Sequence, residues 1–246
     1  SSINSAFILN NPLLVFISMV VLYVAAWLSI FAINNKKITE RNRIKEAFST
    51  AIQQLRSNRL GVANTDDRLT AIYALEILAK DHKELYQTVI DVLVNYVREN
   101  APMPPHFEKK PSDTTRVDVQ AAMTVLGRRH VTYSEQGLNL HRVYLPKINL
   151  KYANLQNADL MGADLCGADL SQAKLQGASL FNVNLLDTNL VGANIKGSDF
   201  TATRGLSCDQ LKMARKWKST YRDQELSNGA EIPDFLEKYG PIADTI

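Results

Sequence analysis

The chain has 246 residues, of which 46% are hydrophobic and 22% charged, and its formal net charge at pH 7 is +3. These values are ordinary for a folded protein and exclude a largely disordered chain, and the small net charge argues against a whole-chain affinity for nucleic acid. The two cysteines, Cys166 and Cys208, are far apart and in no paired motif. We therefore expect neither a disulfide framework nor a structural zinc site.

A short segment, 1–11, precedes an uncharged run of 22 residues, 12–33. As a helix this run would measure about 33 Å, enough to cross the hydrocarbon core of a bilayer. It lacks the polar face of most core helices, and no Lys or Arg precedes it as in a signal peptide. We therefore predict a transmembrane helix over 12–33.

Positive charge follows this run on one side only. The stretch 34–60 carries seven basic and two acidic residues. Because basic residues remain on the cytoplasmic side, we predict an integral membrane protein with its N-terminus outside and its bulk on the cytoplasmic face. The candidate contacts to anionic lipid headgroups are Lys36, Lys37, Arg41 and Arg43.

Helical periodicity fills the stretch 34–130. The spacing of apolar residues predicts an amphipathic helix over 38–55. Residues 64–67, with the sequence NTDD, offer N-caps for a helix over 68–80, which is apolar almost all round and is therefore expected to be buried.

The next predicted helix, over 83–100, ends before Pro102, and a shorter one over 114–129 has Gly127 as its expected C-cap. An inward apolar stripe on the first of these is formed by Leu85, Val89, Val92, Leu93, Tyr96 and Val97.

A five-residue rhythm runs from Leu138 to Phe200. If the large apolar residue is position i, leucine occupies it eleven times in succession, from Leu140 to Leu190. Position i−2 is mostly Ala, position i−1 is mostly Asp or Asn, and position i+2 favours Gly or Asn. The regularity makes the acidic residues part of the repeat rather than candidate catalytic groups.

In an extended chain, positions i−2 and i share one face while i−1 points to the other. The next inward pair begins at i+3, so the chain must turn a corner in between, where Gly and Asn supply backbone freedom. A corner in every repeat makes a coil whose turns stack at about 4.8 Å with the leucines along its axis. An α-helix is excluded because a five-residue step rotates by about 140°.

The pattern A(D/N)LXX, clearest in ANLQNADLMGADLCGADL, resembles that of the bacterial pentapeptide-repeat family over about thirteen repeats. The upstream segments RLTAIYALEILAKD, VRENAP and DVQAAMTVLGRR also look like the region before the repeats in that family. The resemblance implies a right-handed, four-sided β-helix with four repeats per turn. This chain would be a membrane-anchored member.

The expected fold class is α+β: one transmembrane helix, a small α-helical region, a quadrilateral β-helix and a C-terminal helical cap. The cap would be a helix in SCDQLKMARKWKSTYRD that begins at Ser207 and closes the coil with Leu211, Ala214 and Trp217. The expected domains are 1–11, 12–33, 34–130, 131–203 and 204–246.

Two classes of function are disfavoured. Some members of that family mimic DNA and bind gyrase, which requires a strongly acidic rod, whereas 131–200 contains six acidic and five basic residues. We therefore expect no nucleic acid as a partner. No nucleophile triad, metal motif or phosphate loop is present, so we expect no enzyme activity, cofactor or metal.

Position i+1 is expected to point outward, and several apolar residues near it are unusual for a free surface. The candidate partner-binding residues are Tyr144, Met161, Cys166, Phe181 and Leu186. Two explanations stay open: a partner contacts them, or the chain's own tail or upstream helices cover them.

The favoured function is a non-enzymatic, membrane-anchored scaffold or interaction protein. It would be an accessory or stabilising subunit of a membrane protein complex, photosynthetic or respiratory. The alternative is a membrane-tethered localisation or regulatory factor.

Overall fold

The computed structural model describes residues 12–56, 58–59, 62–105, 112–129 and 137–220. The chain divides into two compact units, Ser1–Ile52 and Gln53–Ile246.

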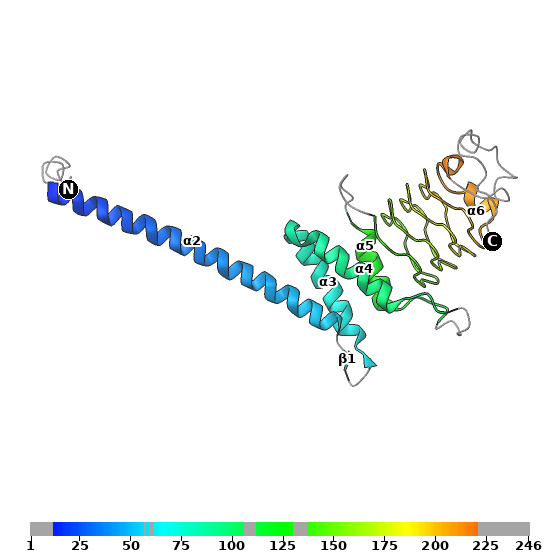
Figure 1. Cartoon of the computed structure of the whole chain (residues 1–246), viewed down its shortest axis with the longest axis horizontal. Coiled ribbons are helices and arrows are strands. Elements are labelled where there is room, and N and C mark those ends of the chain that lie inside the picture. The colour runs from blue at the N-terminus through cyan, green and yellow to red at the C-terminus, as the bar shows by residue number, and fades with distance from the viewer. Residues whose placement is uncertain (1–11, 57, 60–61, 106–111, 130–136, 221–246) are drawn as a thin grey trace. The chain divides into compact units, whose positions relative to one another are not determined.

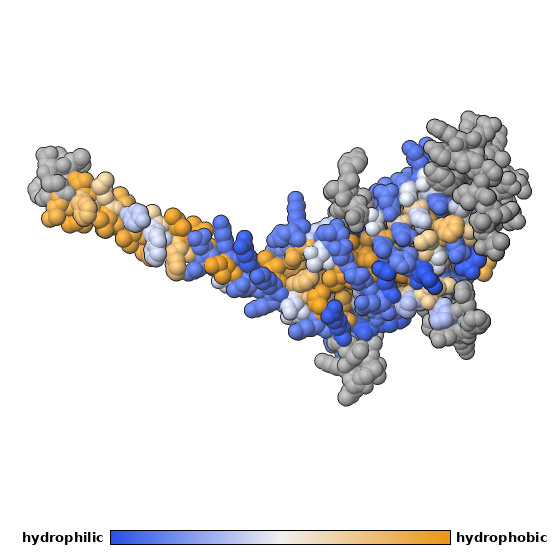
Figure 2. All heavy atoms as spheres, viewed as in Figure 1, coloured by the Kyte–Doolittle hydropathy of each residue, from blue (hydrophilic) through white to orange (hydrophobic). Residues whose placement is uncertain are grey.

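The first unit is dominated by helix α2, Pro12–Leu55, which is 44 residues long (Figure 1). Pro12 stands at its first position, where a missing N–H has no consequence. The helix is long and apolar enough to cross a membrane. Figure 2 shows that its first part is hydrophobic and that hydrophilic side chains take over further along.

Helix α2 is continuous through the predicted end of the membrane span at residue 33, so the expected amphipathic helix over 38–55 is its second half. No Pro or Gly stands between Phe31 and Leu55 to interrupt it. The predicted stripe of that half is confirmed, since its members are buried or half-buried: Ile44, Phe48, Ala51, Ile52 and Leu55.

Near the start of the second unit lies an antiparallel hairpin of two strands with two residues each, β1 Asn58–Arg59 and β2 Val62–Ala63. Three helices follow: α3 Thr65–Asp81, α4 Tyr86–Asn100 after a short 3-10 turn at Lys83–Leu85, and α5 Val117–Gly127. Each of these three helices packs against the other two.

Helix α3 begins as the NTDD segment predicts, with Asn64 as the N-cap accepting a hydrogen bond from the Asp67 N–H. The expectation that this helix is buried holds for one face only. Its inner face is buried, but Tyr73 and Ile77 on the outer face are 44% and 59% exposed, because α4 and α5 pack against it from one side only.

Helix α4 buries most of the predicted stripe, including Val89, Leu93, Tyr96 and Val97. The prediction placed Val92 inward as well, but it is only half-buried, while Ile90 and Val94 are buried. The buried face therefore covers a wider arc than the predicted stripe.

Residues 138–204 form the predicted coil. Every position i and i−2 from Leu138 to Phe200 is buried. Parallel bridges join residues twenty apart, from Asn139 with Asp159 to Asn184 with Arg204. Every corner position i+2, from Arg142 to Ala202, has a positive φ between 54° and 68°. Four corners in each twenty-residue turn make a four-sided β-helix of about three turns.

Each side of the coil contributes one bridging residue, so no side between 137 and 204 forms a strand of two or more residues. We number the sides by these residues. Side 1 carries Asn139, Asp159, Ser179 and Asp199; side 2 carries Tyr144, Asp164, Asn184 and Arg204; side 3 carries Asn149, Asp169 and Asn189; side 4 carries Asn154, Lys174, Asn194 and then Arg215. The right-handed sense stays a prediction from the family resemblance.

The helical region closes the first turn of the coil at three sides. Pro102 forms an antiparallel bridge with Val143 beside side 2. The Gln120 side chain exchanges two hydrogen bonds of 2.8 Å with the backbone of Asn149 on side 3. On side 4, the Asn154 N–H donates to the Gly127 carbonyl at 2.7 Å. Backbone groups at the coil's edge are thus paired and unavailable for edge-to-edge association.

The other end is closed partly as predicted. Ser207 caps helix α6, and Leu211 and Ala214 are buried. The helix is only Cys208–Lys212, however, and Trp217 is half-buried in a separate 3-10 turn, Trp217–Ser219. Between them the chain adds one more layer to side 4, where Asn194 bridges Arg215. We call each such layer of a side a rung.

Candidate interaction surface

The corners of the coil carry the outward residues, and three large apolar ones flank side 2. Met161 and Phe181 lie at the corner between sides 1 and 2, and Leu186 lies at the corner between sides 2 and 3. They are 43%, 41% and 48% exposed, respectively. The prediction that they point outward is confirmed. We call these three residues the apolar patch.

Stacking of the turns places the patch residues on successive rungs. The Gly162 N–H donates to the Phe181 carbonyl at 2.9 Å, which sets Met161 directly beside Phe181. In the same way, the Gly167 N–H donates to the Leu186 carbonyl at 2.7 Å and brings Leu186 below Cys166. Cys166 itself is half-buried. The coil geometry therefore assembles residues twenty apart in sequence into one surface.

The surface between the two corners is polar but largely covered. Asp164 is 1% exposed, and its Oδ1 accepts the Cys166 N–H at 3.0 Å. Asn184 in the next turn bonds the Leu186 N–H in the same way, at 3.3 Å. Because these side chains accept hydrogen bonds from the backbone of the corners, their role in the patch is structural rather than reactive.

Tyr144 was predicted to be part of the partner-binding surface, but another segment of the same chain covers it. It is 7% exposed, and its hydroxyl donates to the Ser112 carbonyl at 2.7 Å. The Tyr144 N–H also donates to the Ala101 carbonyl. Pro146, at the next corner, is buried, and its carbonyl accepts both the N–H and the hydroxyl of Thr115. Ala101, Ser112 and Thr115 thus occupy side 2 and its next corner in the first turn, whereas the patch lies in later turns.

The headgroup candidates Lys36, Lys37, Arg41 and Arg43 all lie exposed on α2, beyond its apolar part. Arg43 forms an exposed ion pair with Glu40 at 3.9 Å, a kind of pair that contributes little to stability. Four exposed basic side chains within one helical stretch suit contact with anionic headgroups.

One group of ionisable residues was missed by the sequence prediction. Asp118 of α5 is 1% exposed and lies among three donors: the Tyr96 hydroxyl at 2.7 Å, the Arg68 guanidinium at 3.3 Å and the Arg116 guanidinium. The available signal was the position of Arg68 and Asp118 on the inward faces of their helices. Charged residues at such positions are usually paired.

Burial by itself would raise the pKa of the Asp118 carboxyl, but hydrogen bonds from Tyr96 and Arg116 outweigh it and hold that pKa below its ordinary value. The pKa of Tyr96 is raised, mainly by burial and secondly by its hydrogen bond to Asp118. Asp118 therefore stays ionised and Tyr96 stays protonated at neutral pH. The cluster is a structural tie between α3, α4 and α5, since each of its groups is already bonded within the protein.

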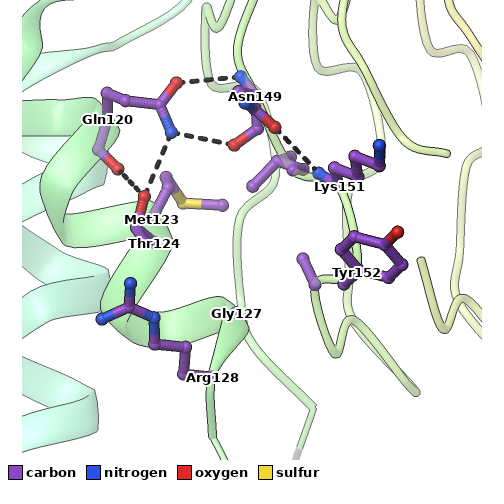
Figure 3. A pocket seen from close by; sticks show the side chains of 10 residues that line it. Gln120, Met123, Thr124, Gly127, Arg128, Asn149, Lys151 and Tyr152 are labelled. Carbon is purple, nitrogen blue, oxygen red and sulfur yellow. Dashed lines mark hydrogen bonds between the residues drawn. The ribbon is translucent and has the colours of Figure 1, made fainter. Parts of the chain in front are cut away.

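An open pocket of about 620 Å³ lies where α5 meets the first turn of the coil (Figure 3). Two of the polar side chains shown there are bonded within the chain: Gln120 to the Asn149 backbone, and Thr124 to the Gln120 carbonyl. Arg128 pairs with Glu76 at 3.6 Å. The pocket lies at the seam between two structural elements, and Lys151 and Tyr152 complete its polar lining. Among the described residues, no group of three His, Cys, Asp or Glu side chains is arranged to hold a metal ion.

The coil and its closed ends define a solenoid built on a five-residue unit. Residues 136–204 match the family described as pentapeptide repeats, in 8 copies over 136–167, 145–180 and 168–204. This part of the chain is a pentapeptide-repeat segment, as the sequence pattern predicted.

Solved structures of pentapeptide repeat proteins are similar to part of the chain. One from the cyanobacterium Cyanothece 51142 is 33% identical over 35% of this chain and 58% of its own, with a TM-score of 0.19. One from Nostoc Pcc 7120 is 29% identical over 46% of this chain and 99% of its own, with a TM-score of 0.20. One from the Arabidopsis thaliana thylakoid lumen is 28% identical over 42% of this chain and 79% of its own, with a TM-score of 0.15.

The chain thus spans little more than half the length of the Cyanothece protein. No curated protein matches it significantly.

Proposed function

We propose that this protein is a membrane-anchored, non-enzymatic interaction module, and that its coil binds a protein subunit of a membrane complex. The observation that carries this proposal is the exposure of Met161, Phe181 and Leu186 around one side of the coil. An accessory subunit of a photosynthetic or respiratory assembly is the concrete form of the proposal.

The patch differs from the equivalent positions at the corner after side 4. The corner after side 4 carries polar residues, Gln156, Gln176 and Lys196, at the same repeat position. Burying apolar surface stabilises a complex by about 25 cal/mol per Å². Aromatic and methionine side chains are enriched at interface cores. The location of these residues at side 2 therefore favours a protein partner at that side.

The proposed anchor is the apolar part of α2. It is long enough to span a bilayer, and the exposed Lys36, Lys37, Arg41 and Arg43 follow it on one side only. Under the positive-inside rule, this asymmetry favours an N-terminus outside and repeats on the cytoplasmic face. Anionic headgroups would contact the four basic side chains.

Replacing the patch with charges tests the proposal. Met161→Asp, Phe181→Asp and Leu186→Lys together should release partner subunits, because charged side chains at an apolar interface stay solvated only if the interface separates. The measurement is mild detergent extraction, native electrophoresis and mass spectrometry of the co-migrating proteins. Val191→Asp is the matched control, since Val191 is 47% exposed at the same repeat position of a different corner.

The proposal predicts that the control retains the partner and that both variants keep the wild-type unfolding temperature. Retention of the partner by the triple variant would contradict the patch as an interface. A wild-type chain that runs alone at its own mass would favour a localisation or regulatory factor instead.

A further inference from the structure

Side 4 of the coil, with the corner that follows it, has no acidic residue and is basic in its last three rungs. It comprises 153–157, 173–177, 193–197 and the closing rung 213–219. These segments contain no acidic residue and five exposed basic ones: Lys174, Lys196, Arg215, Lys216 and Lys218. All acidic residues of the described coil lie on the other sides or their corners, at Asp159, Asp164, Asp169, Asp187 and Asp199.

The backbone bridges bring the five basic residues together. Lys174 bridges Asn194, and Asn194 bridges Arg215. The Gly197 N–H donates to the Ser219 carbonyl at 2.8 Å, which brings Lys216–Ser219 beneath the corner that carries Lys196. The charges therefore occupy three successive rungs about 4.8 Å apart, on one flat side of the solenoid.

From this arrangement we infer that side 4 lies against the anionic headgroups of a lipid bilayer. An array of exposed positive charges on one side attracts an opposing layer of negative charge. The stacked rungs form one side of the coil, which suits a laterally mobile array of headgroups. The closing rung 213–219 adds two side chains of the kind found at membrane–water interfaces. They are Met213, which is 62% exposed, and Trp217, whose ring lies 5.8 Å from the Lys218 ammonium.

The inference rests on the proposed function in one respect: the anchor holds the coil near a bilayer. A tethered surface binds with an effective concentration set by the tether, so a few weak electrostatic contacts are sufficient. Side 4 is opposite side 2 in a four-sided coil, so lipid contact at side 4 leaves the apolar patch open to a partner. Screening by salt must weaken the contact, because these charges are exposed.

The test uses the full chain with vesicles of phosphatidylcholine, with or without phosphatidylglycerol. In a Cys166→Ser, Cys208→Ser background, a dye is attached at Ser219→Cys on the basic side or at Ser179→Cys on side 1. The measurement is quenching by a headgroup-attached quencher. Phosphatidylglycerol should increase quenching at residue 219 and leave residue 179 unchanged, and salt should reverse the increase.

Two charge-matched variants isolate side 4. Lys174→Glu, Lys196→Glu and Lys218→Glu together should reduce quenching at residue 219 to the level seen in phosphatidylcholine alone. Arg142→Glu, Lys147→Glu and Lys151→Glu, which make the same change in net charge at other corners, should keep it. Equal quenching at residue 219 in neutral and anionic vesicles overturns the inference.

Other outcomes are equally decisive. If the side 4 variant loses a co-purifying acidic protein while its quenching is unchanged, the basic side serves that protein and the lipid inference is wrong. Resistance of the chain to alkaline extraction separately tests the anchor. Quenching at residue 219 that depends on side 4 supports the inference even for a chain that alkali extracts.

Discussion

At the residue scale, the repeat depends on hydrogen bonds from its polar position to its own corner. The side chain at i−1 accepts the N–H of i+1, as Asp159 does from Met161 at 3.0 Å and Asp169 from Ser171 at 2.9 Å. The corner that follows has positive φ even where it is not glycine, as at Tyr152 with φ 62°. Such a backbone is unfavourable for most residues, and the stacked turns and these local bonds offset its cost.

We predict that Asp159→Ala lowers the stability of the coil by about 1 kcal/mol, because it leaves the Met161 N–H without its acceptor. Asp159→Asn keeps an acceptor oxygen and should remain near wild type. Thermal unfolding in detergent followed by circular dichroism measures both. Equal loss in the two variants would show that charge, rather than the hydrogen bond, is what the position requires.

At the element scale, the three helices and the coil are joined by two different devices. The Asp118 cluster ties α3, α4 and α5 through a buried carboxylate and its three donors. Close packing joins α5 to the first turn of the coil, where Gly127 faces Ala153. The stability contributed by the Asp118 cluster should depend on pH, and that of the Gly127 contact on side-chain volume.

The Asp118 cluster should make stability depend on acid pH. Because the folded state lowers the pKa of Asp118, its contribution is complete above the unfolded value of about 3.9 and is lost as pH falls below it through the folded value. Asp118→Asn should cost about 3–5 kcal/mol at neutral pH, since it leaves buried guanidinium charge without its counterion.

The measurement is the unfolding temperature of both proteins between pH 7 and pH 3. The gap between them should narrow as the pH falls. A gap that is constant over this range would mean that Asp118 does not titrate with folding.

A methyl group at Gly127 should push α5 off the coil. Its Cβ would lie 2.9 Å from the Ala153 Cβ and 3.4 Å from the Ala153 Cα, and such overpacking costs about 1–3 kcal/mol. Ala153→Gly should relieve the closer contact, so the double variant should be more stable than Gly127→Ala alone. A double-mutant cycle by thermal unfolding tests this, and strictly additive effects would contradict direct contact as the cause.

At the scale of the whole molecule, each unit has one dominant feature. The first is an apolar helix whose side chains are exposed, such as Leu22 and Tyr23 at 70% and 74%. The second is a solenoid closed by the chain before and after it. Closed ends suit a monomeric coil, because unpaired backbone edges would otherwise recruit further strands.

The anchor is tested by charge in the middle of the apolar run. Val24→Lys should impair membrane insertion, since a lysine at the centre of a transmembrane helix costs about 2.5–3.5 kcal/mol. Val24→Leu, which keeps the helix apolar, should insert normally. The fraction of chain that resists alkaline extraction measures insertion in both variants. Full extraction of the wild-type chain would contradict the membrane anchor.

The repeat and the helices were predictable because their signals are local. Alternation between inward and outward residues, with a corner in each repeat, specifies the coil from Leu138 to Phe200 whatever surrounds it. Errors arose where neighbouring elements determine burial. Tyr73 and Ile77 are apolar but exposed because α3 is covered on one side, and the closing helix is short because the chain continues as a rung at Arg215.

The amino-acid sequence by itself determined the five-residue coil, the apolar run that precedes it and the outward positions at its corners, because each follows from the order of side chains along a few residues. Only the tertiary structure decided which outward positions are accessible. Tyr144 lies under Ser112, more than thirty residues away, whereas Met161 and Phe181 remain open. It also decided that Arg68, Tyr96 and Asp118 meet, because burial and pairing depend on contacts between distant segments.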